Sequence, residues 1–184
     1  MPPLGDARAR IVLVGLAPAA HGGNRTGRIF TGDRSGEFLF AALHRAGLAS
    51  SPVSVGPGDG LVLRDVWITS AVRCAPPANR PTPQEQQRCL GFLSEEMELL
   101  ARRRVVVALG GLAWKAALRA SGVRSGGGFG HGAIRDLPGG KALLGCYHPS
   151  QQNTFTGRLT PAMLDAVLEK AKALSRAGPP PGLS

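Results

Sequence analysis

Four short apolar runs, each bounded by polar or glycine-containing segments, constrain the fold of this chain more than any other feature. The runs are Arg10–Leu16, Asp65–Val72, Arg104–Leu109 and Ala142–Tyr147. Runs of this length are typical of strands that are buried on both faces of a parallel sheet. The stretches between them are long enough to hold crossover helices, so the pattern predicts repeated β-α-β units.

The segments between and after these runs show helical signals. Thr82, Pro83 and Glu85 form a capping box with a proline in the first turn, which predicts a helix from there to about Arg103. Three more helices are expected at Glu37–Leu48, Gly111–Ala120 and Pro161–Arg176. The elements together predict an α/β fold, with a four-stranded parallel sheet covered by helices on both faces.

Length and composition favour one globular domain. The chain has 184 residues, of which 43% are hydrophobic, and we expect a domain over residues 1–177 and a disordered tail over residues 178–184. No stretch approaches the roughly 18 consecutive apolar residues of a membrane span, and the N-terminus does not resemble a signal peptide. The odd number of cysteines, three, argues against a secreted disulfide framework. A cytoplasmic protein is expected.

The charge balance is strongly basic. The formal net charge is +10, and the 22 basic residues comprise 18 arginines and four lysines. Such an excess favours polyanions, and the planar arginine fork matches phosphate. The codon usage of a GC-rich genome is an alternative explanation, because it raises Arg, Ala, Gly and Pro together. Charge therefore favours a nucleic-acid partner without establishing one.

Polar loops follow three of the predicted strands, at residues 17–36, 73–80 and 148–160. Because ligands of parallel sheets bind at the carboxyl ends of the strands, we expect these loops to meet in one cleft. The first loop contains neither GxGxxG nor GxxxxGK[ST], which argues against a nucleotide-dependent enzyme. Within it, Phe30 either anchors the loop or stacks on a flat ligand. Asp33 either caps the next helix or supplies a carboxylate to the cleft.

The loop at residues 148–160 carries hydrogen-bonding and apolar groups. His148 is placed to donate a hydrogen bond into the cleft, although a lone histidine is more often a structural donor. Asn153 is one of several small donors suited to sugar-phosphate contacts. Phe155 or Leu159 would supply an apolar wedge for a base stack.

The cysteines offer a second kind of site. Cys74 and Cys89 are either half of a four-thiolate zinc or iron–sulfur site or two ordinary thiols. Cys146 lies in an apolar run and is expected in the core.

Three segments together resemble the type-5 uracil-DNA glycosylases, the iron–sulfur branch of the uracil-DNA glycosylase superfamily. They read GLAPAAHGGNRTGRIFTGD (residues 15–33), VRCAPPANRPTP (72–83) and YHPSQQNTFTGRLT (147–160). The likeness covers about residues 8–176. It implies a three-layer α/β/α sandwich around a four-stranded parallel sheet. It also implies a monomeric DNA repair enzyme that works on DNA at the nucleoid. Such an enzyme flips out uracil, hypoxanthine or xanthine and hydrolyses the N-glycosidic bond, leaving an abasic site.

The resemblance assigns roles to individual residues. Asp33 matches the candidate for water activation, and His148 matches the histidine that hydrogen-bonds the departing base. Phe30 matches the aromatic residue that stacks on the flipped base, and Asn79 matches a polar residue near that base. Ala17 stands where other branches carry a polar catalytic group, which implies a roomier substrate pocket.

Further substrate contacts are expected from His131, which matches a family position in FGHG, and from Asn153. The rival function class is a protein that binds damaged DNA without cutting it. Asp33, Phe30 and His148 favour the enzyme, because a binding module has no need of a water-activating carboxylate.

The resemblance also implies a 4Fe–4S cluster, held by Cys74, Cys89 and a Cys-x-x-Cys pair upstream of the first strand. No such pair precedes Arg10 in this chain, so its ligand set is incomplete. We expect that the sequence given begins later than the natural start.

Overall fold

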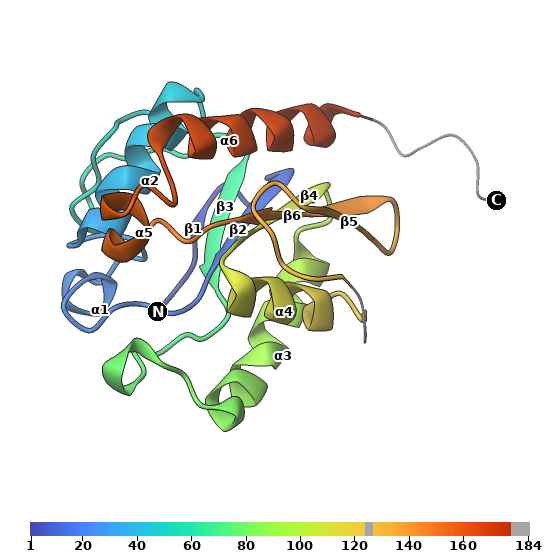
Figure 1. The fold of residues 1–184 in the computed structure, drawn as a ribbon, viewed down its shortest axis with the longest axis horizontal. Coiled ribbons are helices and arrows are strands. Elements are labelled where there is room, and N and C mark those ends of the chain that lie inside the picture. The colour runs from blue at the N-terminus through green and yellow to red at the C-terminus, as the bar shows by residue number, and fades with distance from the viewer. Residues whose placement is uncertain (124–126, 178–184) are drawn as a thin grey trace.

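The computed structural model describes residues 1–123 and 127–177, so the predicted tail at residues 178–184 lies outside the described residues. The described part of the chain forms one six-stranded sheet in the order β1-β3-β2-β4-β6-β5 (Figure 1). Its four central strands are mutually parallel and correspond to the four predicted apolar runs. They are β3 (Val66–Ser70), β2 (Ile11–Gly15), β4 (Val105–Leu109) and β6 (Lys141–Cys146).

The prediction of only four strands was wrong at both edges of the sheet. β1 (Leu4–Gly5) pairs antiparallel with β3, and β5 (Ile134–Leu137) pairs antiparallel with β6. β1 has only two residues, and β5 reads IRDL with its isoleucine exposed. Neither segment carries the buried apolar run that marks a central strand, so hydrophobic periodicity could not reveal them.

The four long helices lie close to the predicted positions. They are α2 (Arg34–Arg45), α3 (Pro83–Leu99), α4 (Gly111–Ala120) and α6 (Pro161–Arg176). The capping box at Thr82 is present as predicted. α2 begins earlier than expected because the Asp33 side chain caps it. Three short helical turns occupy predicted loops, namely α1 (Gly23–Thr26), η1 (Pro77–Asn79) and α5 (Gln151–Phe155).

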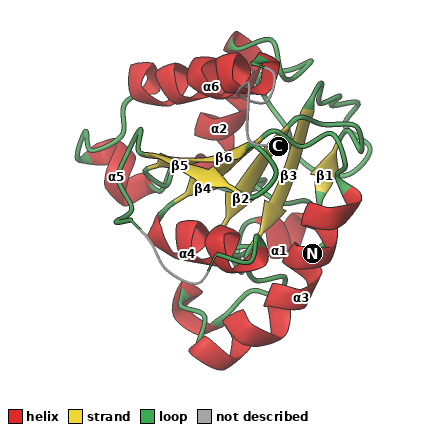
Figure 2. Ribbon diagram, turned by 90° about the vertical axis from the view of Figure 1, so that its right-hand side faces the viewer, coloured by secondary structure: helices red, strands yellow, loops and turns green. Residues whose placement is uncertain are grey.

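Alternation along the strands builds two separate cores and thereby three layers. Ile11 and Leu13 face a cluster that includes buried residues of α2 and α6. Val12 and Val14 face the opposite cluster, which includes buried residues of α3 and α4. Figure 2 shows the sheet between these two helical layers, which confirms the predicted α/β/α sandwich. No helix in residues 1–123 and 127–177 is long and apolar enough to cross a membrane.

The strand order also places the site. β2 lies between β3 and β4 in the sheet. The two parallel strands that follow β2 in the sequence therefore pair with its opposite sides. Such a reversal opens a crevice at the carboxyl ends of the strands.

Candidate active site

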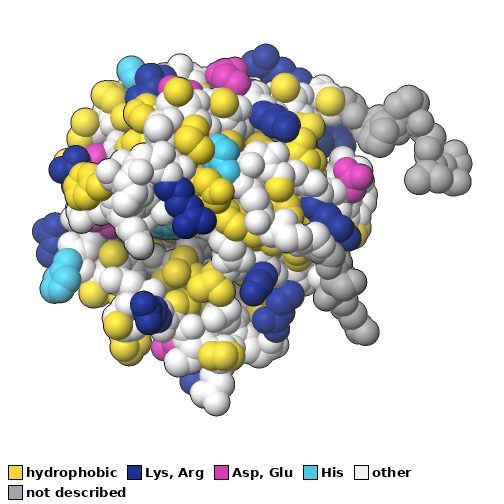
Figure 3. All heavy atoms as spheres, in the orientation of Figure 1, with side chains coloured by type: hydrophobic (Ala, Val, Ile, Leu, Met, Phe, Trp, Pro, Cys, Tyr) yellow, Lys and Arg dark blue, Asp and Glu magenta, His cyan; other side chains and the backbone are white. Residues whose placement is uncertain are grey.

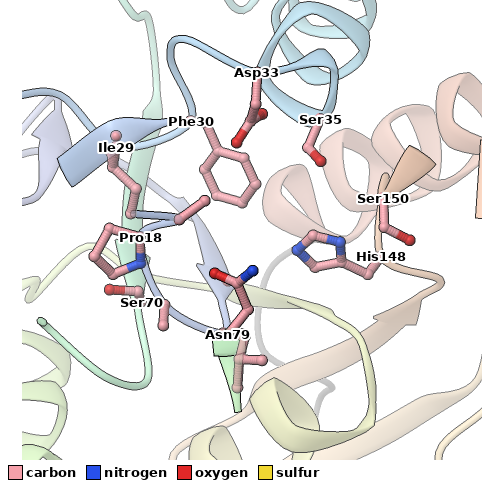
Figure 4. Close-up of a pocket in the computed structure, with 14 residues that line it drawn as sticks. Pro18, Ile29, Phe30, Asp33, Ser35, Ser70, Asn79, His148 and Ser150 are labelled. Carbon is pink, nitrogen blue, oxygen red and sulfur yellow. The ribbon is translucent and has the colours of Figure 1, made fainter. Parts of the chain in front are cut away.

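The three polar loops meet in one cavity at the carboxyl ends of β2, β3 and β6, as predicted from the sequence. Its volume is about 220 Å³. This is below the roughly 300–1,000 Å³ of pockets for drug-sized ligands, and it suits a small group. Side chains from all three loops point into it (Figure 4). The lining residues are Gly15, Leu16, Ala17, Pro18, Ala19, Gly23, Ile29, Phe30, Asp33, Ser35, Ser70, Asn79, His148 and Ser150.

Asp33 fills both of the roles that the sequence left open. Its Oδ1 accepts a hydrogen bond of 3.0 Å from the backbone N–H of Gly36 and so caps α2. Its carboxylate also borders the cavity, next to the ring of Phe30 (Figure 4). The capping hydrogen bond holds the Asp33 carboxylate at the start of α2. The carboxylate oxygens keep further lone pairs, which can accept another hydrogen bond. Among the residues that line the cavity, Asp33 is the one acidic side chain.

Phe30 is held in an unusual backbone conformation beside the end of β2. Its φ is +56°, in the left-handed region that residues other than glycine rarely adopt. A side chain at Gly36 would collide with the Phe30 carbonyl, and a Cβ at Gly15 would lie 2.8 Å from its ring. Ala78 (φ +51°) and Asn79 (φ +56°), at the facing turn, share this conformation. Such strain costs about 1–3 kcal/mol per residue and clusters at ligand sites.

His148 faces Phe30 across the cavity. The two ring centroids are 6.2 Å apart, and the ring planes differ by 30°. Burial lowers the pKa of His148, while the negative charge of Asp33 opposes that shift. The imidazole is therefore neutral near pH 7, with one N–H available as a donor and the other nitrogen as an acceptor.

Asn153 lies behind His148 and is absent from the cavity lining. Its Nδ2 donates a hydrogen bond of 2.8 Å to the His148 carbonyl oxygen. Its backbone N–H donates to Oγ of Ser150, which caps α5. The structure thus ties Asn153 to the backbone that carries His148.

His131 also lies outside the cavity lining. Its Nδ1 accepts a 3.3 Å hydrogen bond from the Tyr147 N–H, and its ring lies 5.1 Å from the Tyr147 ring. Burial lowers the pKa of His131, although a hydrogen bond to the Met163 backbone raises it. This histidine supports the strand end that precedes His148.

An ion pair that the sequence did not reveal braces the loop that carries Phe30. Arg28 Nη1 lies 2.5 Å from Asp59 Oδ1, and both side chains are only 11% exposed. Burial alone would raise the pKa of Asp59. Hydrogen bonds from the backbone of Leu61 and Val55, and from Ser54 and Arg28, lower it further than burial raises it. Arg28 and Asp59 are 31 residues apart, so no local motif signals the pair.

Apolar, aromatic and basic side chains stand on the loop at residues 148–160 and at the start of α2. Leu159 is 1% exposed and buried in the core, so its prediction as a wedge was wrong. Phe155 is 65% exposed, with the guanidinium of Arg34 4.9 Å from its ring. Arg158 lies 4.7 Å from the ring of Tyr147. The face shown in Figure 3 is hollowed, with Lys and Arg side chains beside the hollow.

The cysteines do not complete a metal site in the described residues. Cys74 is exposed, Cys89 is half-buried, and Cys146 is buried as predicted. Nowhere in residues 1–123 and 127–177 do three His, Cys, Asp or Glu side chains gather as metal ligands. A 4Fe–4S centre takes four thiolates, so the donor set present does not fit that group, and no chemistry is assigned to it below.

Comparison with known proteins identifies the family of this chain. The uracil DNA glycosylase superfamily matches residues 2–172. The chain is 56% identical over 178 residues to a type-5 uracil-DNA glycosylase of Mycobacterium tuberculosis, covering 95% of this chain and 66% of that protein. It is 55% identical over 176 residues to the Thermus thermophilus type-5 enzyme, covering 95% and 80% respectively.

A type-5 uracil-DNA glycosylase of Pyrobaculum aerophilum is 52% identical over 173 residues, covering 94% of this chain and 75% of that protein. The chain thus spans about two thirds of the length of its mycobacterial relative and a larger share of the other two. The superfamily match covers nearly the whole sequence, and all three relatives align with almost all of it. The chain therefore belongs to the uracil-DNA glycosylase superfamily and, within it, to the type-5 uracil-DNA glycosylases.

Proposed function

We propose that this chain is a monofunctional DNA repair glycosylase, which hydrolyses the N-glycosidic bond of uracil and other deaminated bases in DNA. The observation that carries the proposal is the meeting of Phe30, Asp33 and His148 around one small cavity. Family membership supports the reaction class, and the similar proteins of Mycobacterium tuberculosis and Thermus thermophilus are uracil-DNA glycosylases.

A base inside a duplex cannot reach a cavity at the end of a sheet, so the target nucleotide must be flipped out. The Phe30 ring offers a flat face on which the base stacks. The Asn79 amide, which lines the cavity, offers both a donor and an acceptor to the edge of the base. Phe155 is an exposed apolar group on the same loop as His148, and it would fill the gap left in the stack.

The reaction breaks the C1′–N1 bond and leaves its electron pair on the base. Positive charge grows on the sugar and negative charge on the uracil. A neutral His148 donates its N–H to the uracil carbonyl oxygen that gains this charge, so the donor acts most strongly in the transition state.

Water completes the reaction by adding its oxygen to C1′. The proton that this water loses passes to the Asp33 carboxylate, which then releases it to solvent. The Asp33 carboxylate also stabilises the cationic sugar. Because Oδ1 is engaged by Gly36, the water is assigned to the remaining lone pairs of the carboxylate.

The wall next to β2 supports the proposal of a broad choice of bases. Leu16 and Ala17 line the cavity without a polar side chain that would test one base edge. A hydrophobic wall discriminates weakly between similar ligands, so hypoxanthine and xanthine are proposed as further substrates.

The test is excision from labelled oligonucleotides that bear one uracil, hypoxanthine or xanthine, followed by alkali to break abasic sites. Wild type should cut all three, and Asp33→Asn should lose about 10²–10⁴-fold in rate. Asp165→Asn is the matched control, because Asp165 pairs with Arg45 on the surface. Retained activity in Asp33→Asn would move the water-handling role elsewhere. Duplex binding by wild type with no excision would favour the damaged-DNA-binding function.

A further inference from the structure

A second cavity lies at the opposite end of the parallel strands from the active site. Its volume is about 480 Å³. Arg103 precedes β4 and Lys141 begins β6, so the cavity lies at the amino ends of these two strands, whereas the active site lies at the carboxyl ends of the parallel strands. Its lining residues are Ser94, Met97, Glu98, Arg103, Arg119, Ala120, Ser121, Gly122, Leu137, Pro138 and Lys141.

Arg103 is the unusual member of this lining. The residue is only 8% exposed, and its Nε has no hydrogen-bond partner. None of the ion pairs found in residues 1–123 and 127–177 includes it. Buried arginines are normally paired, because an uncompensated charge in a low-dielectric site is costly. A water molecule would satisfy the donor but would leave the charge unbalanced.

The neighbouring groups add to this positive charge. Burial lowers the pKa of Lys141, and the positive charges of Arg103 and Arg104 lower it further. Arg119, also in the lining, donates to the amide oxygen of Gln87, which carries no charge. The buried hydroxyl of Ser121 also lacks a partner.

The lining contains one acidic residue, Glu98, which is solvent-exposed. It makes no ion pair with Arg103 or Lys141 among the described residues. The cavity therefore holds three cations, of which Arg119 is exposed, against one exposed carboxylate. Two buried donor atoms in its lining, Arg103 Nε and Ser121 Oγ, have no hydrogen-bond partner.

We propose that Arg103, Lys141 and Ser121 form a binding site for a phosphate group, separate from the active site. The Arg103 fork and the Lys141 ammonium match the charge and the several acceptor oxygens of phosphate. The Ser121 hydroxyl supplies a third donor. The phosphate is either free phosphate or a phosphodiester of DNA, and both present the same oxyanion to these groups.

The site is too distant to serve the base in the active site. Seven residues separate Lys141 from His148 along β6 and its loop, which is roughly 20 Å at about 3.3 Å per residue. A phosphate beside the flipped nucleotide cannot reach both ends of the strands. The proposal therefore stands or falls independently of the glycosylase chemistry.

The first experiment titrates inorganic phosphate into the chain by isothermal calorimetry, with thermal unfolding in phosphate and in chloride at matched ionic strength. Wild type should bind phosphate and unfold at a higher temperature in its presence. Arg103→Gln and Lys141→Gln should each weaken phosphate binding about tenfold. Without phosphate, Arg103→Gln should be at least as stable as wild type, since it removes an uncompensated buried charge.

Arg88→Gln is the control, because it removes one positive charge from an exposed position on α3. All three variants should excise uracil at the wild-type rate. If Arg103→Gln fails to fold, Lys141→Gln provides the same test, because Lys141 is only half-buried. Equal phosphate affinity in wild type and Lys141→Gln, or no response of wild type beyond that to chloride, overturns the proposal.

An undamaged duplex then identifies the source of the phosphate. If phosphate competes with the duplex, and Arg103→Gln weakens duplex binding, the site takes a DNA phosphodiester. If duplex binding is unchanged while phosphate binding is lost, the site takes the free anion. Both results support an oxyanion site.

Discussion

Gly15→Ala tests whether the Phe30 ring must lie where the structure places it. A Cβ at position 15 would be 2.8 Å from Phe30 Cζ and 3.0 Å from Cε2. Ordinary carbon contacts are about 3.5–4.0 Å, so the ring must move by roughly 1 Å toward the empty cavity. A displacement of this size in a group that positions substrate costs on the order of 10²-fold in rate. The added methyl should cost only about 1 kcal/mol of stability, or roughly 2–4 °C in Tm.

The assay is single-turnover excision of uracil from a labelled oligonucleotide, in the wild-type and the Phe30→Leu background. Gly15→Ala should slow wild type about 100-fold. It should slow Phe30→Leu by no more than about threefold, because the smaller side chain removes the clash. Gly91→Ala is the control, since nothing lies within 4 Å of a Cβ at that helical position. Equal losses in both backgrounds would refute the argument that the effect passes through the ring.

The remaining predictions concern pH, the wedge and a helix cap. Burial lowers the pKa of His148, so the unfolded chain binds its proton first as pH falls below about 6.5. Stability should therefore fall with decreasing pH, by at most about 1.4 kcal/mol per pH unit, and the slope in denaturant titrations should be shallower in His148→Gln. Phe155→Ala should slow excision from duplex much more than from single-stranded DNA, whereas equal slowing would exclude a wedge. Leu159→Ala should instead destabilise the fold by about 2–5 kcal/mol in urea unfolding. Thr82→Ala should cost about 1 kcal/mol through the capping box while excision stays unchanged, and a loss of activity would contradict a purely structural role.

The central strands and long helices were predictable because their signals are local. Buried strands such as Val105–Leu109 read as continuous apolar runs, and Thr82 with Glu85 marks a helix start within four residues. The edge strands were not predictable, because a two-residue strand and an exposed IRDL segment have no periodicity.

The site was partly predictable for the same reason. Loops that follow parallel strands must meet, so Ala17, Asn79 and His148 were expected together. Sequence could not place Asn153 and His131 behind the cavity, because their orientation depends on tertiary hydrogen bonds to the His148 carbonyl and to Tyr147. The Arg28–Asp59 brace depends on a long-range contact in the same way.

The most direct test of the account is chromatographic detection of free uracil from a uracil-containing duplex, with wild type and His148→Ala under single-turnover conditions. Wild type should release uracil and leave an abasic site. His148→Ala should release it about 10²–10³-fold more slowly while still binding the duplex, because a donor to the departing base is lost. Release by His148→Ala at the wild-type rate, or duplex binding by wild type without any free uracil, would contradict the account.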